Sequence, residues 1–331
     1  MTSLTDSYGR AIRDLRISVT DRCNFRCFYC LPEAEAPMAR RETILSFEEI
    51  ARLAGVFVDL GIEKVRLTGG EPMLRRGIAD LVRQISVLKP QLKDIALTTN
   101  GQSFPENAAG LKDAGLDRVT ISLDSLRRER FREMTGVDAL EKPLAAIKAA
   151  KQVGFDPVKV NAVVVRGRND DELVDFARFA REEGVSFRFI EFMPLDSGHG
   201  WDRGMVVSAR EMRDAIDAVF PLKLKEATRG SGTAWKYGFA DGSPGEIGLI
   251  APVTEMFCGQ CSRIRLTADG QIRTCLFSTT EHDLRGLLRS GATDAELADF
   301  IREAVLQKEP RHRINDAEFV QPARTMSFIG G

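Results

Sequence analysis

The sequence predicts an α/β fold, namely a partial, TIM-like barrel of six βα units with a C-terminal extension. The main observation is that strand-like and helix-like segments alternate six times up to Met193. Strict alternation is typical of a parallel sheet covered by helices, and a complete barrel of this class needs about eight units. Six units therefore indicate a barrel that is open on one side. After Met193 the segments become short and are broken by glycines, so we expect a barrel domain over residues 1–230 and a smaller region over residues 231–331.

The individual elements follow from apolar spacing and from cap residues. The first predicted helix, residues 46–60, has apolar residues at helical spacing, a capping box of Ser46 and Glu49, and a terminating Gly61. The predicted strands cover residues 15–19, 64–68, 94–98, 118–123, 158–164 and 187–191. Further helices are predicted over residues 105–114, 140–153, 171–182, 209–220 and 294–307, and a hairpin over residues 264–267 and 272–276.

The bulk composition is that of a soluble globular protein, with 331 residues of which 43% are hydrophobic and 29% charged. A net charge of −1 gives no global field that would recruit nucleic acid or a membrane surface. The N-terminus lacks the apolar core of a secretory signal, and no apolar run approaches the ~20 residues of a membrane span. We therefore expect a cytoplasmic protein whose thiols stay reduced.

Polar and apolar residues alternate along the predicted strands. Strands that are buried on both faces usually read as continuous apolar runs, whereas Arg16 here lies between Leu15 and Ile17. Because the outer helices are amphipathic, the apolar set should face them and the polar set should face a lumen. Cations are costly in a dry core, so we expect a hollow lumen that binds an anion; an open sheet with one wetted face is the alternative. The residues predicted to face the lumen are Arg16, Arg66, Thr68, Thr98, Asn100, Ser122, Lys159, Asn161, Glu191 and Met193.

The six cysteines fall into two groups of three, which in a reducing compartment indicates metal or cluster ligands. Cys23, Cys27 and Cys30 follow the first predicted strand with the spacing C-x3-C-x2-C. Three thiolates can bind three irons of a 4Fe–4S cluster and leave the fourth iron open for a ligand. A zinc site usually takes four protein ligands, and none of the three histidines is near this loop, so zinc is the weaker interpretation.

The second group, Cys258, Cys261 and Cys275, has the spacing C-x2-C-x13-C and again offers three ligands. The C-x2-C pair is common in zinc ribbons, and His282 could complete a Cys3His site. On residue chemistry alone, a zinc ion and a second iron–sulfur cluster both stay open for this group.

The first cysteine motif, with the aromatic Tyr29 before its last cysteine, resembles the radical S-adenosylmethionine family. The resemblance implies that the open iron binds S-adenosylmethionine, whose reductive cleavage gives a 5′-deoxyadenosyl radical. The glycines of the turn Gly69-Gly70-Glu71-Pro72 would permit close approach of the backbone to this ligand. The resemblance assigns contacts with S-adenosylmethionine to Gly70, Ser122, Met193 and the main chain of Tyr29.

Further stretches are similar to the GTP 3′,8-cyclase family of molybdenum cofactor synthesis, and they cover nearly the whole chain in collinear order. They include Arg13-Asp14-Leu15-Arg16, Arg66-Leu67-Thr68-Gly69-Gly70, Leu97-Thr98-Thr99-Asn100-Gly101, Arg188-Phe189-Ile190-Glu191-Phe192-Met193, Cys261-Ser262-Arg263-Ile264-Arg265-Leu266 and the terminal Gly330-Gly331. The resemblance implies that the second cysteine group holds a 4Fe–4S cluster whose open iron binds the guanine of GTP. It assigns GTP contacts to Arg16, Arg66, Thr98, Lys159, Arg263, Ile264 and Arg265.

The same resemblance implies a reaction. The radical takes hydrogen from C3′ of the GTP ribose, the C3′ radical attacks C8 of the guanine, and an electron and a proton complete 3′,8-cyclo-7,8-dihydro-GTP. The implied cofactors are two 4Fe–4S clusters and S-adenosylmethionine. The implied partners are a flavodoxin-like electron donor and a downstream cyclic pyranopterin monophosphate synthase. A homodimer is compatible with this interpretation, and neither nucleic acid nor a membrane is expected as a partner. The residues with implied catalytic roles are Arg16, Arg263, Arg265 and, in a tail that reaches the active site, Gly330 and Gly331.

Two other functions stay open at this point. A different radical enzyme with an auxiliary cluster, for example a peptide-modifying one, would have no particular need for phosphate-binding arginines at strand ends. A non-enzymatic zinc or iron–sulfur protein would have closed four-coordinate sites and no affinity for S-adenosylmethionine. The arginines that argue against the first alternative are Arg16, Arg66, Arg263 and Arg265.

Overall fold

The computed structural model describes residues 3–31, 38–196 and 198–330. Strands and helices alternate in it as far as β6, as expected. The strands are β1 (Asp14–Ser18), β2 (Lys64–Thr68), β3 (Asp94–Thr99), β4 (Arg118–Ser122), β5 (Lys159–Val164), β6 (Ser186–Glu191), β7 (Leu222–Leu224), β8 (Trp235–Phe239), β9 (Glu246–Ile250), β10 (Arg263–Leu266), β11 (Gln271–Arg273) and β12 (His282–Asp283). The helices are α1 (Phe47–Asp59), α2 (Ile78–Ser86), α3 (Ala108–Asp113), α4 (Arg128–Thr135), α5 (Glu141–Gln152), α6 (Leu173–Glu183), α7 (Ala209–Asp217), α8 (Leu284–Arg289), α9 (Asp294–Leu306) and α10 (Met326–Ile329).

In the described part of the chain the strands form one 12-stranded sheet, in the order β12-β11-β10-β1-β2-β3-β4-β5-β6-β9-β8-β7. Every neighbouring pair from β10 through β1 and β6 to β9 is parallel, and the outermost pairs at both ends are antiparallel. No pairing among the described residues joins the two edges of the sheet. The predicted fold class, a partial barrel with a C-terminal extension, is confirmed.

The C-terminal strands extend both edges of the sheet, because β9 pairs with β6 and β10 pairs with β1. The predicted hairpin is formed by β10 and β11, but the prediction that its second strand reaches residue 276 is wrong, since β11 ends at Arg273. The chain leaves the sheet there for two reasons. The Thr274 carbonyl accepts a hydrogen bond from Lys308, and Ser278 N donates to Cys275 O at 3.3 Å in a turn.

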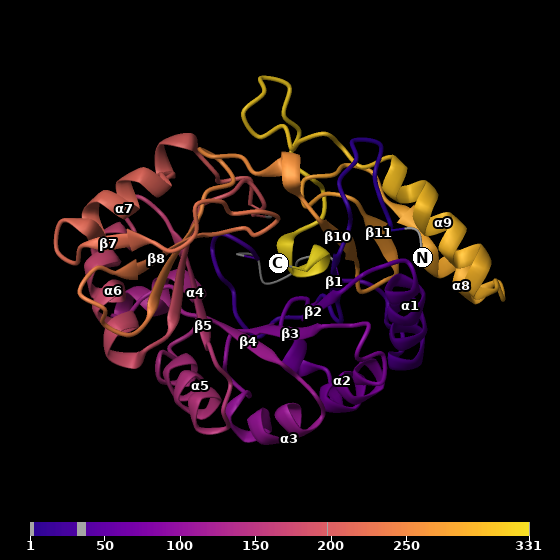
Figure 1. The fold of residues 1–331 in the computed structure, drawn as a ribbon, viewed down its shortest axis with the longest axis horizontal. Helices are drawn as coiled ribbons and strands as arrows, with labels where there is room; N and C mark the ends of the chain where they lie inside the picture. The colour runs from indigo at the N-terminus through magenta and orange to yellow at the C-terminus, as the bar shows by residue number, and fades with distance from the viewer. Residues whose placement is uncertain (1–2, 32–37, 197, 331) are drawn as a thin grey trace.

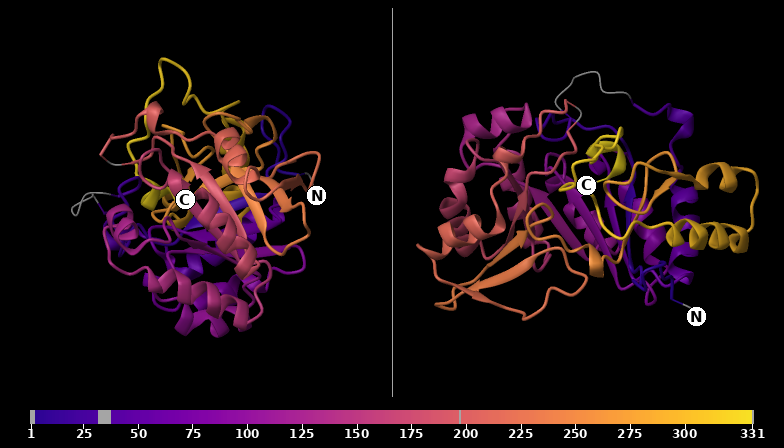
Figure 2. Two further views of the ribbon diagram at one scale, coloured as in Figure 1. Left: turned by 90° about the vertical axis from the view of Figure 1, so that its left-hand side faces the viewer. Right: turned by 90° about the horizontal axis from the view of Figure 1, so that it is seen from above.

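The helices between the strands lie on the convex outside of the curved sheet (Figure 1). In α1 the predicted capping box of Ser46 and Glu49 is present, and Ile50, Leu53 and Phe57 are fully buried. Figures 1 and 2 show the C-terminal segment on the opposite, concave side of the sheet, which we call the lumen. No helix of the described residues has the length and apolar character needed to cross a membrane.

Candidate active site

The sheet topology places the two cysteine groups at opposite ends of the lumen. The first group follows the carboxyl end of β1. Cys261 precedes β10, which runs parallel to β1, and Cys275 follows β11, which runs antiparallel to β10. The second group therefore lies at the amino ends of the parallel strands, with the lumen between the two groups.

The first cysteine loop is held against α4, because Arg26 N donates to Thr135 O at 2.8 Å. Cys30 N donates to Cys27 O at 3.0 Å, so the last two cysteines share one turn. Burial, followed by nearby charges that include Cys30 and Cys23, raises the pKa of Cys27 well above its ordinary value. Burial, followed by the charge of Cys23, raises the pKa of Cys30 as well. A loop that carries three partly buried thiols suits an iron–sulfur cluster, which would bind them as thiolates.

Gly69 and Gly70 pack the end of β2 against this cysteine loop. Gly70 N donates to Thr20 O at 2.8 Å. A Cβ on Gly70 would lie 2.2 Å from Arg22 O, and one on Gly69, whose φ is +144°, would lie 2.3 Å from Thr20 O. The sequence led us to expect close approach of these glycines to a ligand. In the structure the close approach is to the backbone of the cysteine loop, so the glycines also position the cluster ligands.

Glu71 ties the same turn to the end of β3. Its carboxylate accepts hydrogen bonds from Thr99 Oγ1 and Asn100 N, both at 2.7 Å. Burial raises the pKa of Glu71 to about 7, although these hydrogen bonds lower it. Asn100 Nδ2 in turn donates to Asn24 Oδ1 at 2.8 Å, inside the cysteine loop. Asn100, which the strand pattern predicted to face the lumen, is therefore engaged in holding this loop.

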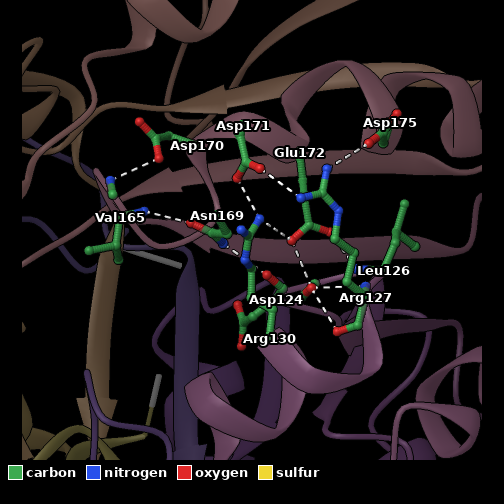
Figure 3. Close-up of polar contacts among 12 residues, drawn as sticks. Asp124, Leu126, Arg127, Arg130, Val165, Asn169, Asp170, Asp171, Glu172 and Asp175 are labelled. Atoms are coloured by element: carbon green, nitrogen blue, oxygen red, sulfur yellow. Dashed lines mark hydrogen bonds and ion pairs between the residues drawn. The ribbon is translucent and has the colours of Figure 1, made fainter.

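Tyr29 fastens the cysteine loop to the ends of β4 and β5. Its hydroxyl donates to Asp124 Oδ2 at 2.6 Å, and Asn169 Nδ2 donates to the Asp124 carbonyl at 2.8 Å. Figure 3 shows Asp124 and Asn169 beside a larger network, in which the buried Glu172 pairs with Arg130 at 3.0 Å. The polar network therefore fixes the strand ends at which the S-adenosylmethionine contacts are predicted.

The structure brings the four predicted S-adenosylmethionine residues to one end of the lumen. Tyr29 and Gly70 lie in the cysteine loop and in the turn that packs on it. Ser122 ends β4 and Met193 follows β6, both at the carboxyl ends of parallel strands. The side chain of Met193 packs against a small apolar cluster built around Leu195 and Val253.

The second cysteine group lies among cations. Arg10 Nη1 donates to Cys258 O at 2.9 Å, and Lys308 Nζ donates to Arg263 O at 2.9 Å. Burial raises the pKa of Cys261, but the charges of Arg263 and Lys308 outweigh it, so that pKa is lowered. A lowered pKa favours the thiolate form, which is the form that an iron–sulfur cluster binds. Burial raises the pKa values of Cys258 and Cys275, so in this group the effect is confined to Cys261.

The alternative zinc ligand His282 lies in β12, opposite Ile272. Among the described residues, no three His, Cys, Asp or Glu side chains form a group that could hold a single metal ion. A cluster does not require such convergence, because each thiolate of a 4Fe–4S cube binds its own iron.

A cavity of about 230 Å³ lies at the amino ends of the parallel strands. Arg16, Arg66, Lys159 and Arg263, four of the predicted GTP contacts, line it. Thr98, a fifth, accepts a hydrogen bond from Arg66 Nη1 at 3.2 Å. The cations of the lining are Arg16, Lys64, Arg66, Arg118, Lys159, Arg188, Arg229, Lys236 and Arg263, and its acids are Asp14 and Asp94.

The crowded cations lower one another's pKa values. Burial, followed by the charge of Arg188, lowers the pKa of Lys159 to about 6. Burial, followed by neighbouring arginines, lowers the pKa of Arg16 well below its ordinary value. Like charges held this close are costly without a counter-charge. The cavity therefore suits a polyanion, and its arginines offer the planar fork that pairs with phosphate oxygens.

Ile264 and Arg265, the last two of the seven predicted GTP contacts, do not line this cavity, and neither does Thr98. The side chain of Ile264 is buried in the hydrophobic core, so only its main chain could serve a ligand. Arg265 is buried farther along β10, and its Nη1 donates to Gly330 O.

The C-terminal tail ends between the cavity and the first cysteine loop. Gly330 has a φ of +84°, and a Cβ there would lie 2.3 Å from Thr68 Oγ1 and 3.2 Å from Ser18 Cβ. Ser18 and Thr68 are the last residues of β1 and β2. The predicted active-site glycine Gly330 therefore does reach the lumen, whereas Gly331 lies outside the described residues.

Arg324 fastens this tail to the segment that carries the second cysteine group. Its guanidinium pairs with Asp269 at 2.9 Å and Glu281 at 2.8 Å and lies 4.3 Å from the centre of the Phe328 ring. Replacing Arg324 with alanine should release the tail and lower the GTP cyclisation that the resemblance implies by roughly tenfold or more, because charged hydrogen bonds are lost. Product formation and iron content are measured together. The exposed Arg311→Ala is the control, and equal turnover of both variants would show that Arg324 does not position the tail.

Sequence reasoning missed Arg188, which lines the cavity from β6. Arg188 lies between Phe187 and Phe189, so the alternation that selected Arg16 would also have selected it. The position of the Arg188 side chain beside β9 could not be predicted from the sequence. A Cβ on Gly248 of β9 would lie 2.9 Å from Arg188 Cγ, and the sequence did not indicate that β9 pairs with β6.

The prediction that Glu191 faces the lumen is wrong. Its carboxylate is fully buried and accepts hydrogen bonds from Ala209 N at 3.0 Å and Val253 N at 2.8 Å. Glu191 therefore joins β6 to the start of α7 and to the segment that follows β9, and its role is structural.

Comparison with known proteins shows the family of this chain. The sequence model of the Radical SAM superfamily matches residues 17–180, and that of Molybdenum Cofactor Synthesis C matches residues 185–314. The GTP 3′,8-cyclase of Streptomyces coelicolor is 46% identical over 330 residues, which span 99% of this chain and 96% of the relative. The chain belongs to the GTP 3′,8-cyclase family. The GTP 3′,8-cyclase of Mycolicibacterium smegmatis is also 46% identical, over 332 residues that span 99% of this chain and 92% of the relative.

Solved structures share the fold of this GTP 3′,8-cyclase family member. The crystal structure of Streptococcus suis SuiB has a TM-score of 0.64 and 16% identity, and covers 96% of this chain and 77% of SuiB. Native anSMEcpe with bound AdoMet has a TM-score of 0.58 and 14% identity. The match covers 91% of this chain and 82% of the anSMEcpe chain. At such identities the likeness shows the fold alone, and the relatives of higher identity show the family.

Proposed function

We propose that this chain is a GTP 3′,8-cyclase, which converts GTP into 3′,8-cyclo-7,8-dihydro-GTP in the first step of molybdenum cofactor synthesis. When bound, a reduced 4Fe–4S cluster and S-adenosylmethionine supply the 5′-deoxyadenosyl radical that takes hydrogen from C3′ of GTP. C3′ then bonds to C8 of the guanine, and one electron and one proton complete the product. The observation that carries the proposal is a cationic cavity at the same end of the barrel as the second cysteine group, with the first group at the other end, in a member of this family.

The two ends of the lumen have different tasks in this proposal. The carboxyl end of the sheet binds S-adenosylmethionine, and the amino end binds GTP. The ligands of the first cluster are Cys23, Cys27 and Cys30, and those of the second are Cys258, Cys261 and Cys275. The residues that contact S-adenosylmethionine are Gly70, Ser122, Met193 and the main chain of Tyr29.

Four cations of the cavity bind the triphosphate of GTP. Arg16, Arg66, Lys159 and Arg263 surround one space, and their charge offsets that of the phosphates. Arg265 Nη1 donates a hydrogen bond to Gly330 O. These two residues close the lumen on the side of the first cysteine loop. A closed lumen excludes water and oxygen from the radicals.

The proposal includes the organisation of the chain and its partners. Residues 1–230 form the part that binds S-adenosylmethionine, and residues 231–331 carry the auxiliary cluster and part of the GTP site. A flavodoxin-like protein supplies the electrons, and a cyclic pyranopterin monophosphate synthase consumes the product.

The test is an anaerobic assay of the reconstituted protein with a reductant, S-adenosylmethionine and GTP, followed by mass spectrometry. The proposal predicts 5′-deoxyadenosine together with an isomer of GTP. Formation of 5′-deoxyadenosine with unchanged GTP would favour a radical enzyme with another substrate, such as a peptide. If neither product forms on a protein with both clusters intact, the enzymatic function itself is refuted.

The low pKa of Lys159 predicts that GTP binding takes up a proton. Burial and neighbouring arginines hold this pKa at about 6 in the free protein, so at pH 8 the amine is mostly neutral. The triphosphate favours the ammonium form and raises the pKa, so GTP affinity should fall as the pH rises above about 6, the pKa of the free protein. Calorimetry in buffers of different ionisation enthalpy measures the uptake. Lys159→Met should abolish it, and equal uptake in both proteins would contradict the assignment.

A further inference from the structure

The segment between β7 and β8 forms one wall of the cationic cavity. None of its residues is among the predicted GTP contacts. The residues of this segment and of β8 that line the cavity are Arg229, Ser231, Gly232, Thr233, Ala234 and Lys236.

Arg229 is held in a defined orientation by two aromatic rings. Its guanidinium carbon lies 5.1 Å from the centre of the Trp235 ring and 4.8 Å from that of Phe257. Arg263, a predicted GTP contact, lies 5.1 Å from the same Phe257 ring. The two guanidinium groups therefore share one aromatic platform at the wall of the cavity.

The turn that carries Arg229 is also fixed to the sheet. Arg263 Nη1 donates to Ser231 O at 3.1 Å, and Gly232 N donates to Arg229 O at 3.0 Å. The bond from Arg263 holds the turn against the start of β10, two residues after Cys261 of the second cysteine group.

Within the part of the chain that the structure describes, Arg229 Nη1 is buried and has no hydrogen-bond partner. A buried N–H group without a partner is costly, and such groups normally have an acceptor. The acids of the cavity are engaged elsewhere, because Asp94 accepts from Arg118 Nε at 2.5 Å and Asp14 accepts from Ser262. The acids that line the cavity therefore leave Arg229 Nη1 without an acceptor, and the group is available to a ligand of the cavity.

We propose that Arg229 binds the β- or γ-phosphate of GTP and thereby selects the triphosphate over shorter nucleotides. This inference rests on the proposed GTP cyclisation and adds a residue to its binding site. Arginine suits the task because its planar fork pairs with two phosphate oxygens and remains charged. Lys236, the other cation of this wall, already pairs with Glu226 at 3.0 Å, which leaves Arg229 as the free donor of the segment.

The test measures binding without turnover, on anaerobic protein with both clusters but without S-adenosylmethionine and reductant. The dissociation constants of GTP, GDP and GMP are compared for the wild type and for Arg229→Ala. We expect roughly tenfold weaker GTP binding in the variant, because one charged hydrogen-bond pair is lost, and little change for GMP. Arg229→Lys, which keeps the charge but loses the fork, should fall between the two. Lys223→Ala, an exposed lysine of β7 outside the cavity, is the control and should bind like the wild type.

Two results would overturn the inference. Unchanged GTP affinity in Arg229→Ala would show that Arg229 does not contact the nucleotide. An equal loss of affinity for GTP and for GMP would show that Arg229 does not contact the β- or γ-phosphate. Iron content and thermal unfolding of each variant check that the clusters and the fold are kept. Failure of the proposed function is separate, since in that case the wild type itself would form no GTP isomer.

Discussion

Replacing Gly70 with alanine is expected to remove the first cluster and, with it, all cyclase activity. The added Cβ would lie 2.2 Å from Arg22 O and 2.5 Å from Arg22 C. These are backbone atoms of the loop that leads to Cys23, so no side-chain rotation can relieve the clash, and the loop must move. A displaced loop cannot hold three thiolates on one cluster.

The expected magnitude is large. Without the first cluster nothing in the chain can generate the radical, so product formation should fall by at least about a thousandfold. Iron per chain should fall to roughly half of the wild-type value, because the second cluster is at the other end of the barrel. The matched control is Gly110→Ala in α3, where a Cβ would meet nothing within 4 Å. A Gly70→Ala protein with full iron content and normal 5′-deoxyadenosine formation would contradict the positioning role.

Deleting Gly330 and Gly331 is expected to abolish cyclisation while both clusters remain. Gly330 O is the acceptor for the buried Arg265 guanidinium, and no other described acceptor bonds to that group. Truncation leaves this cation without a partner next to Arg16 and opens the lumen beside the first cysteine loop. We expect a loss of at least roughly a hundredfold in product, in line with the removal of a buried charged partner.

A single substitution sharpens the test of the tail. Gly330→Ala should behave like the deletion, since its φ of +84° is unfavourable for alanine and its Cβ would lie 2.3 Å from Thr68 Oγ1. Val320→Ala, an exposed position upstream in the same segment, is the control and should turn over normally. Full turnover by the truncated protein, measured as GTP isomer per chain, would refute the role of the tail.

Local sequence patterns predicted much of this site. The alternation around Arg16 and Lys159 placed both residues in a lumen, and the structure puts them in one cationic cavity. The spacing of Cys23, Cys27 and Cys30 after a strand predicted a three-ligand site, and the structure places the three residues in one loop after β1, with Cys27 and Cys30 in a single turn. Such features are local, because the period of a strand and the length of a loop are visible within a few residues.

The features that sequence reasoning missed depend on contacts between distant segments. The pairing of β9 with β6 creates the space for Arg188 beside Gly248. No local sequence pattern predicts which edge of the sheet a C-terminal strand will join. The partner of Gly70 is a main-chain carbonyl of the cysteine loop, and the partners of Glu191 are main-chain amides after β9 and at α7. These pairings follow from the complete fold, so they could be assigned only from the three-dimensional structure.

The most direct test of the central claim uses GTP deuterated at C3′. In the proposed reaction the radical generated at the carboxyl end of the barrel removes the C3′ hydrogen of a GTP held by the cations at the amino end. Each 5′-deoxyadenosine formed by the reconstituted enzyme should therefore carry deuterium, and the GTP isomer should lose it. Deuterium-free 5′-deoxyadenosine, together with GTP that keeps its label, would contradict the account.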